Sequence, residues 1–134
     1  MNRGDFQRLV DVRLREAEAL LAAGLWDGSY YLAGYAVECA LKACIAKLTQ
    51  AGDFPPDRRF VEACYSHNLA GLLKTAGLQD AFDLAAAADP GLVTSWDEAR
   101  RWSEQSRYAR WSEAECRLMV DAVHGVMTWL TGIW

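Results

Sequence analysis

The stretch SYYLAGYAVECALKACIAKLTQ, residues 29–50, decides the fold of this chain. Almost every position around its helical circumference is apolar until the last turns. A helix with this pattern is buried by several neighbouring elements, so we expect it at the centre of the molecule. Gly34 lowers helix stability by roughly 1 kcal/mol relative to alanine, which indicates that another helix approaches the backbone closely there.

Two charged residues, Glu38 and Lys42, lie one turn apart within this apolar helix. An exposed pair at this spacing contributes only about 0.3–0.5 kcal/mol. Inside a core the pair needs further partners, because unpaired buried charge is costly. We expect Arg107 to contact Glu38 and so to tie the central helix to the turn before the last helix. The alternative is that these charges form a cluster that contacts a ligand.

The rest of the chain is also helical in pattern, with apolar residues at steps of three and four. We expect helices at residues 3–23, 68–76, 79–88, 95–107 and from 112 onward, whereas residues 57–66 could form a helical turn or an ordered loop. Ser112 and Glu115 have the spacing of a capping box. The fold class is therefore all-α, a bundle of four main helices with short connectors, and we expect residues 1–134 to form one domain.

Composition excludes several functional classes. The formal net charge of −4 argues against a nucleic-acid binder that acts through overall positive charge, so any such contact needs a local basic patch. The longest apolar stretch, residues 36–48, is too short and too interrupted by charges to span a bilayer, and the first residues lack the apolar core of a signal peptide. We expect a cytoplasmic protein.

The four cysteines, Cys39, Cys44, Cys64 and Cys116, include no CxxC pair, and only two histidines accompany them. We expect reduced structural thiols, no metal site and no cofactor.

Three pieces of sequence resemble the HEPN domain family. They are LWDGSYYLAGYAVECALKA at residues 25–43, SHNL at 66–69 with LL at 72–73, and SRY at 106–108. The first resembles the family's turn, aromatic pair and Glu followed by Ala-Leu-Lys, and the resemblance extends over roughly residues 5–130. It implies a four- to five-helix up-and-down bundle that is commonly a homodimer. It also implies a place in toxin–antitoxin or defence systems, often beside a nucleotidyltransferase-type partner protein.

Many members of this family are metal-independent ribonucleases that carry an Arg, four to six residues and then a His. Arg117 and His124 match the longest of these spacings and fall on nearly one face of a helix. In a ribonuclease the imidazole would transfer protons and the guanidinium would hold the phosphate. The chain departs from the pattern at Leu118, where a polar residue is usual, and no tyrosine follows two places after His124. The alternative is an arginine and a histidine without a catalytic role.

Residues 96–111 interleave arginines with aromatic residues, among them Trp102 and Tyr108. Such a segment could hold phosphates and stack bases, or it could combine core tryptophans with a solvated basic edge. His67 is expected to cap or pack locally. From these features we expect an interaction module whose basic aromatic segment contacts nucleotide or RNA, with an endoribonuclease acting through Arg117 and His124 as the alternative.

Overall fold

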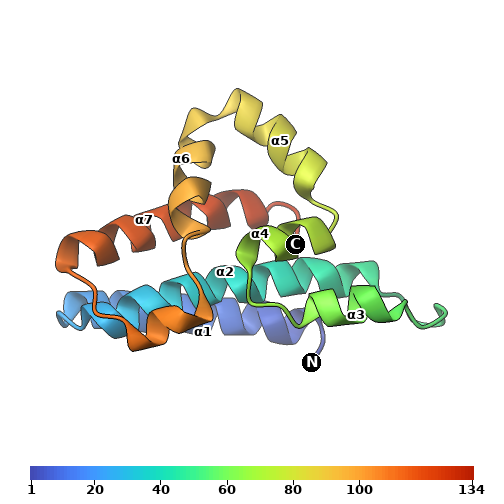
Figure 1. Ribbon diagram of the computed structural model, residues 1–134, viewed down its shortest axis with the longest axis horizontal. Coiled ribbons are helices and arrows are strands. Elements are labelled where there is room, and N and C mark those ends of the chain that lie inside the picture. Colours follow the sequence, from blue (N-terminus) through green and yellow to red (C-terminus); the bar gives the residue numbers. More distant parts are fainter.

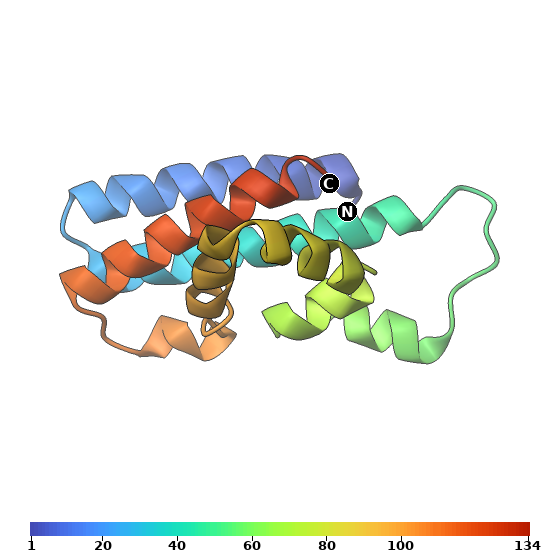
Figure 2. The ribbon, with the colours of Figure 1, turned by 90° about the horizontal axis from the view of Figure 1, so that it is seen from above.

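The computed structural model describes all residues, 1–134, and contains helices and no strands. Three long helices form its base: α1 (Arg3–Ala22), α2 (Trp26–Leu48) and α7 (Glu113–Leu130). They lie side by side, with α2 packed against both α1 and α7 (Figures 1 and 2). The expected all-helical bundle is confirmed.

The central position of α2 is also confirmed, since 13 of its residues are buried. The helix starts at Trp26, earlier than expected, and its first turns are anchored by the Ser29 hydroxyl, which donates to the carbonyl of Ala17 at 2.7 Å. The close approach at Gly34 is made by a side chain rather than by a helix backbone. A Cβ atom at Gly34 would overlap the indole ring of Trp102, whose Nε1 donates to the Tyr31 carbonyl at 3.0 Å.

Shorter elements connect α2 to α7. They are α3 (Arg58–Cys64), α4 (Leu69–Thr75), α5 (Gln79–Ala88), α6 (Pro90–Ala99) and the 3₁₀ helix η1 (Glu104–Tyr108). Residues 57–66 therefore contain a helix, capped by the Asp57 side chain. The predicted helix at 95–107 is wrong, because α6 starts earlier with Asp89 as its N-cap and Pro90 as its first residue, and it ends at Ala99.

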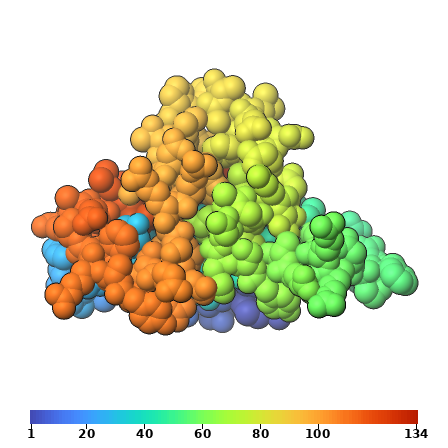
Figure 3. Space-filling model, viewed as in Figure 1, coloured from blue at the N-terminus to red at the C-terminus, as the bar shows by residue number.

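The helices α5 and α6 stand above the three long helices (Figures 1 and 3). They are held there by aromatic contacts, since Phe82 lies 5.6 Å from Trp96 and 5.5 Å from Trp129 between ring centroids. None of the helices combines the length and the apolar content that crossing a membrane requires.

Candidate functional site

A groove of about 680 Å³ lies between α2 and α3, with residues of α1 and η1 at its borders. Its charged lining residues come from α2, from the α3–α4 connection and from η1: Glu38, Lys42, His67, Glu104 and Arg107. Its apolar lining residues include Ile45 and Ala46, further along α2, and Phe60 and Val61 on α3. The groove therefore has a charged end beside η1 and an apolar end beside the exposed loop 49–57.

The charged end is organised around the buried carboxylate of Glu38, which is only 2% exposed. Lys42 Nζ lies 2.9 Å from Glu38 Oε1, so the expected pair is present. His67 Nδ1 lies 3.1 and 3.2 Å from the two oxygens of Glu38, and His67 Nε2 lies 3.3 Å from Glu104 Oε2. When both ring nitrogens are protonated, this imidazole donates to one carboxylate on α2 and to another on η1.

The predicted contact between Arg107 and Glu38 is wrong. The Arg107 guanidinium carbon instead lies 5.4 Å from the ring centroid of Tyr31, and Nε donates to the Glu104 carbonyl at 3.3 Å. The physical reason is that the His67 imidazole already occupies the side of Glu38 that faces η1. Arg107 still lines the same groove.

Sequence reasoning missed His67 because a histidine before a short helix was expected to cap it or pack locally. The Asn68 side chain is the actual cap, since it accepts from the Gly71 amide at 2.7 Å. Asparagine is a preferred N-cap residue, and Asn68 directly precedes α4. The sequence therefore indicated that Asn68 caps this helix and that His67 was free for another role.

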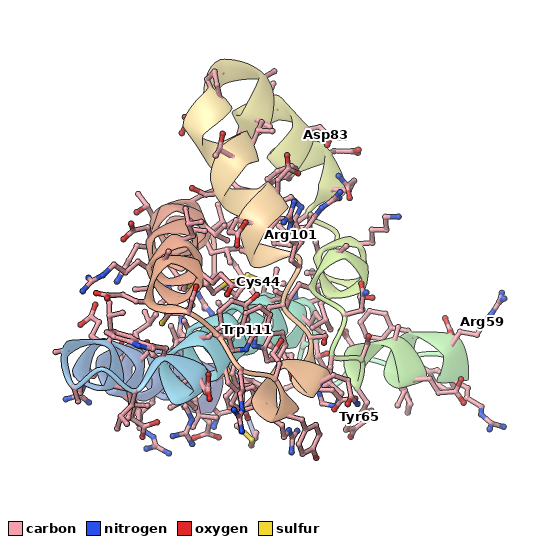
Figure 4. The ribbon with its side chains drawn as sticks, turned by 60° about the vertical axis from the view of Figure 1, so that its left-hand side comes forward. Cys44, Arg59, Tyr65, Asp83, Arg101 and Trp111 are labelled. Atoms are coloured by element: carbon pink, nitrogen blue, oxygen red, sulfur yellow. The ribbon has the colours of Figure 1, made fainter.

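The basic aromatic segment separates into core and surface residues. Trp96 and Trp102 are buried, and Trp111, which is labelled in Figure 4, stacks on Tyr30 with ring centroids 3.7 Å apart. Other side chains of the protein cover these three rings, so they are not available to stack on bases. Tyr108 is 75% exposed, and the guanidinium carbon of Arg107 lies 5.5 Å from its ring centroid. The segment thus offers arginines and one tyrosine to solvent.

Arg117 and His124 are exposed on α7 and do not line the groove. Arg117 pairs with Glu113 on its own helix at 2.9 Å. His124 Nε2 lies 3.0 Å from Oε1 of Glu18 on α1. A carboxylate at this distance can orient an imidazole.

The cysteines are free thiols, of which Cys39, Cys44 and Cys116 are buried and Cys64 is half-buried. Burial raises the pKa of Cys39 and of Cys44 to about 11, so both thiols are protonated at neutral pH. No group of three or more His, Cys, Asp or Glu side chains is arranged to hold a metal ion.

Comparison with known proteins gives one assignment. The family model of the HEPN domain matches residues 11–133. Searches of curated proteins and of solved structures found no match. The family match covers nearly the whole chain and agrees with the helical bundle described above, and the chain therefore belongs to the HEPN domain family.

Proposed function

We propose that this chain is a HEPN interaction module that contacts nucleotide or RNA through its arginine segment, residues 100–110. The observation that carries the proposal is the local charge. These residues carry four arginines and one acidic residue, Glu104, and the whole basic aromatic segment 96–111 adds Asp97 and Glu98, in a chain whose formal net charge is −4. Arg101, Arg107 and Arg110 are exposed and form no ion pair with a carboxylate, so their guanidinium groups are free to meet phosphates.

The arginine segment is also held in a fixed conformation. The Trp111 amide donates to Asp27 Oδ1 at 2.6 Å, and the Trp111 indole donates to the Ser106 carbonyl at 3.2 Å. Fixing the backbone in advance lowers the entropy cost of binding. The exposed ring of Tyr108 adds a surface on which a base can stack.

The proposal is tested with a labelled single-stranded RNA oligonucleotide in a fluorescence anisotropy titration over a series of salt concentrations. We expect the R101E/R110E double variant to weaken binding at least about tenfold at low salt and to reduce the salt slope by about 1.4, since each phosphate contact on a single strand contributes about 0.7. The matched control is R58E/R59E on α3, which makes the same charge change at exposed residues, of which Arg59 is labelled in Figure 4. Equal losses in both variants, or wild-type binding with no salt dependence, would contradict the proposal.

The module is further proposed to act as a homodimer in a toxin–antitoxin, defence or nucleotidyltransferase-associated system. The family match supports this proposal, because the resemblance to the HEPN domain implies a bundle that is commonly a homodimer. Sedimentation equilibrium at micromolar concentration is expected to give twice the chain mass of 14.9 kDa. A monomer that binds neither nucleotide nor RNA nor a partner protein would remove the basis of the proposal.

A second candidate function is metal-independent endoribonuclease activity through Arg117 and His124. It is favoured by their shared exposed face on α7 and by the carboxylate of Glu18 beside the imidazole. His124 would move protons between the 2′-hydroxyl and the leaving oxygen, and Arg117 would hold the phosphate.

Incubation with structured RNA in EDTA tests this candidate. Cleavage that disappears in His124→Ala, slows in Glu18→Gln because the imidazole loses its orienting carboxylate, and persists in Arg15→Ala on α1 is the expected result for an enzyme. Absence of cleavage with enzyme in large excess would exclude it and leave the binding role.

A further inference from the structure

The groove between α2 and α3 shares only Glu104 and Arg107 with the arginine segment, and the rest of its lining lies outside residues 100–110. We propose that it binds a small organic anion with an apolar body, such as a carboxylate on a flat ring or a short acyl chain. The inference goes beyond the proposed function and depends on three independent features: an unfilled apolar wall, a cation without an ion pair at one end, and flat aromatic faces between them.

The first feature is the position of α3. None of its residues is buried, and its backbone packs against α4 rather than against α2. Its side chains Phe60, Val61 and Cys64 face the groove, and α2 supplies Ile45 and Ala46 on the opposite side. Apolar walls that face each other normally close on one another, since each Å² removed from water contributes about 25 cal/mol. Here they border a volume of about 680 Å³, which lies within the range of small-molecule sites.

The second feature is the charge at the η1 end. Both oxygens of Glu38 are occupied by Lys42 and His67, and Glu104 faces the other nitrogen of His67. Arg107 has no carboxylate partner, and its guanidinium rests against the face of Tyr31. Lys42 and His67 thus hold the two carboxylates, and Arg107 is left as a cation without an ion pair, so this end of the groove can receive an anionic group.

The third feature is the aromatic surface between the two ends. The rings of Tyr31 and Tyr35 are nearly parallel, with an interplanar angle of 3° and centroids 6.2 Å apart, and both line the groove. A ligand with its anionic group at Arg107 would lay its body along Tyr35 toward Ile45 and Phe60. His67 and Glu104 border one end, and Thr49 and Pro56 border the other, so the space suits a small molecule rather than an extended polymer.

Three compounds test this inference by calorimetry: 1-naphthoate, its neutral analogue 1-naphthalenemethanol, and AMP. Cys64 lines the groove and is half-buried, so the rate of its alkylation by iodoacetamide reports occupancy, and buried Cys44 is the internal reference. We expect naphthoate to bind, to slow alkylation of Cys64, and to bind at least about tenfold more tightly than the neutral analogue, since a charge-assisted contact is lost in the latter.

Two variants locate the site. Arg107→Glu is expected to weaken naphthoate binding at least about tenfold. Val61→Trp fills the groove from an exposed helix and is expected to abolish binding, whereas the control Arg59→Glu, on the same helix but outside the groove lining, leaves binding unchanged.

The inference would be overturned if the neutral analogue binds as tightly as naphthoate, if Val61→Trp binds normally, or if Cys64 is not protected. Tighter binding of AMP than of naphthoate at the same residues would overturn it as well, by assigning the groove to nucleotides. RNA binding is tested with R101E/R110E and not with Val61→Trp, so failure of the proposed function and failure of this inference are distinguishable.

Discussion

The helices α2 and α3 use similar apolar residues in opposite ways. In α2, 13 residues are buried, and α1, α4, α7 and η1 all pack around it. In α3 no residue is buried, and its apolar side chains border a groove. Burial of apolar surface is the main favourable contribution to folding. We therefore expect α2 to contribute most to the stability of the fold, whereas the apolar side chains of α3 are free to contribute to binding.

The largest expected effect comes from truncating matched apolar residues on the two helices. Leu41→Ala removes a fully buried side chain from α2 and should lower the free energy of unfolding by about 2–5 kcal/mol, because it leaves a cavity. Val61→Ala on α3, where the residue is 39% exposed, should change it by no more than about 0.5 kcal/mol. Urea denaturation measures both. Comparable losses in the two variants would show that α3 is as much part of the core as α2.

The next effect is the difference in stability lost when each of the two carboxylates that His67 contacts is replaced. Glu38→Gln leaves Lys42 without a carboxylate partner in the core and should destabilise the protein by about 2 kcal/mol, less than for a fully buried pair because Lys42 and His67 are partly exposed. Glu104→Gln should cost less than about 0.5 kcal/mol, since the Glu104 side chain is 40% exposed and His67 keeps its contact with Glu38. Thermal unfolding measures both variants, and equal losses of stability would contradict this difference between the two carboxylates.

The same contrast explains what the sequence could predict. The residues of α2 are apolar on nearly all sides over 23 positions, and this length of all-round apolar character, rather than a period, indicates a buried helix. The end of α6 was missed for a physical reason. Trp96, Ala99 and Trp102 are all buried and continue a helical spacing, although the helix stops at Ala99 and Trp102 reaches Gly34 from the following turn. The helical spacing of buried residues can thus continue past the residue at which the helix itself ends.

The candidate site was less predictable than the fold. Glu38 and Lys42 are neighbours on one helix, so their pairing follows from spacing. The contact between His67 and Glu38 joins residues 29 positions apart and depends on the path of the α3–α4 connection. The groove is a space between α1, α2, α3 and η1. A sequence pattern indicates which residues are apolar, but it does not indicate which apolar residues are left without packing contacts across such a space.

A smaller effect concerns the ionisation of buried groups on α2. Burial raises the pKa of Cys39 and Cys44 from 9.0 to about 11, and that of Tyr30 from 10.0 to about 12. The unfolded chain loses these protons at lower pH than the folded chain does, so stability is constant below about pH 9 and falls as pH rises above it. By pH 10 the loss should be about 1 kcal/mol per thiol.

Urea denaturation at pH 8, 9 and 10 measures this loss, and a Cys39→Ala/Cys44→Ala variant should show a shallower decline over the same range. Stability that falls equally steeply in that variant would assign the alkaline loss to groups other than the thiols of α2.

The smallest effect is expected from removing the N-terminal caps of α7, which has buried residues, and of α3, which has none. The hydroxyl of Ser112 accepts from the Glu115 amide at 3.1 Å, and a Glu115 carboxylate oxygen accepts from the Ser112 amide at 3.1 Å. Because α7 carries eight buried residues, Ser112→Ala should lower the free energy of unfolding by about 1 kcal/mol.

Asp57 makes the equivalent bond on α3, accepting from the Phe60 amide at 2.9 Å. Asp57→Ala removes the same kind of contact from a helix that has no fully buried residue, so global stability should change by only a few tenths of a kcal/mol. Its effect should appear as faster amide exchange confined to α3, because local opening there does not expose the core. If Asp57→Ala instead lowers global stability as much as Ser112→Ala, then α3 unfolds together with α2, and the groove wall is part of the same cooperative unit as the core.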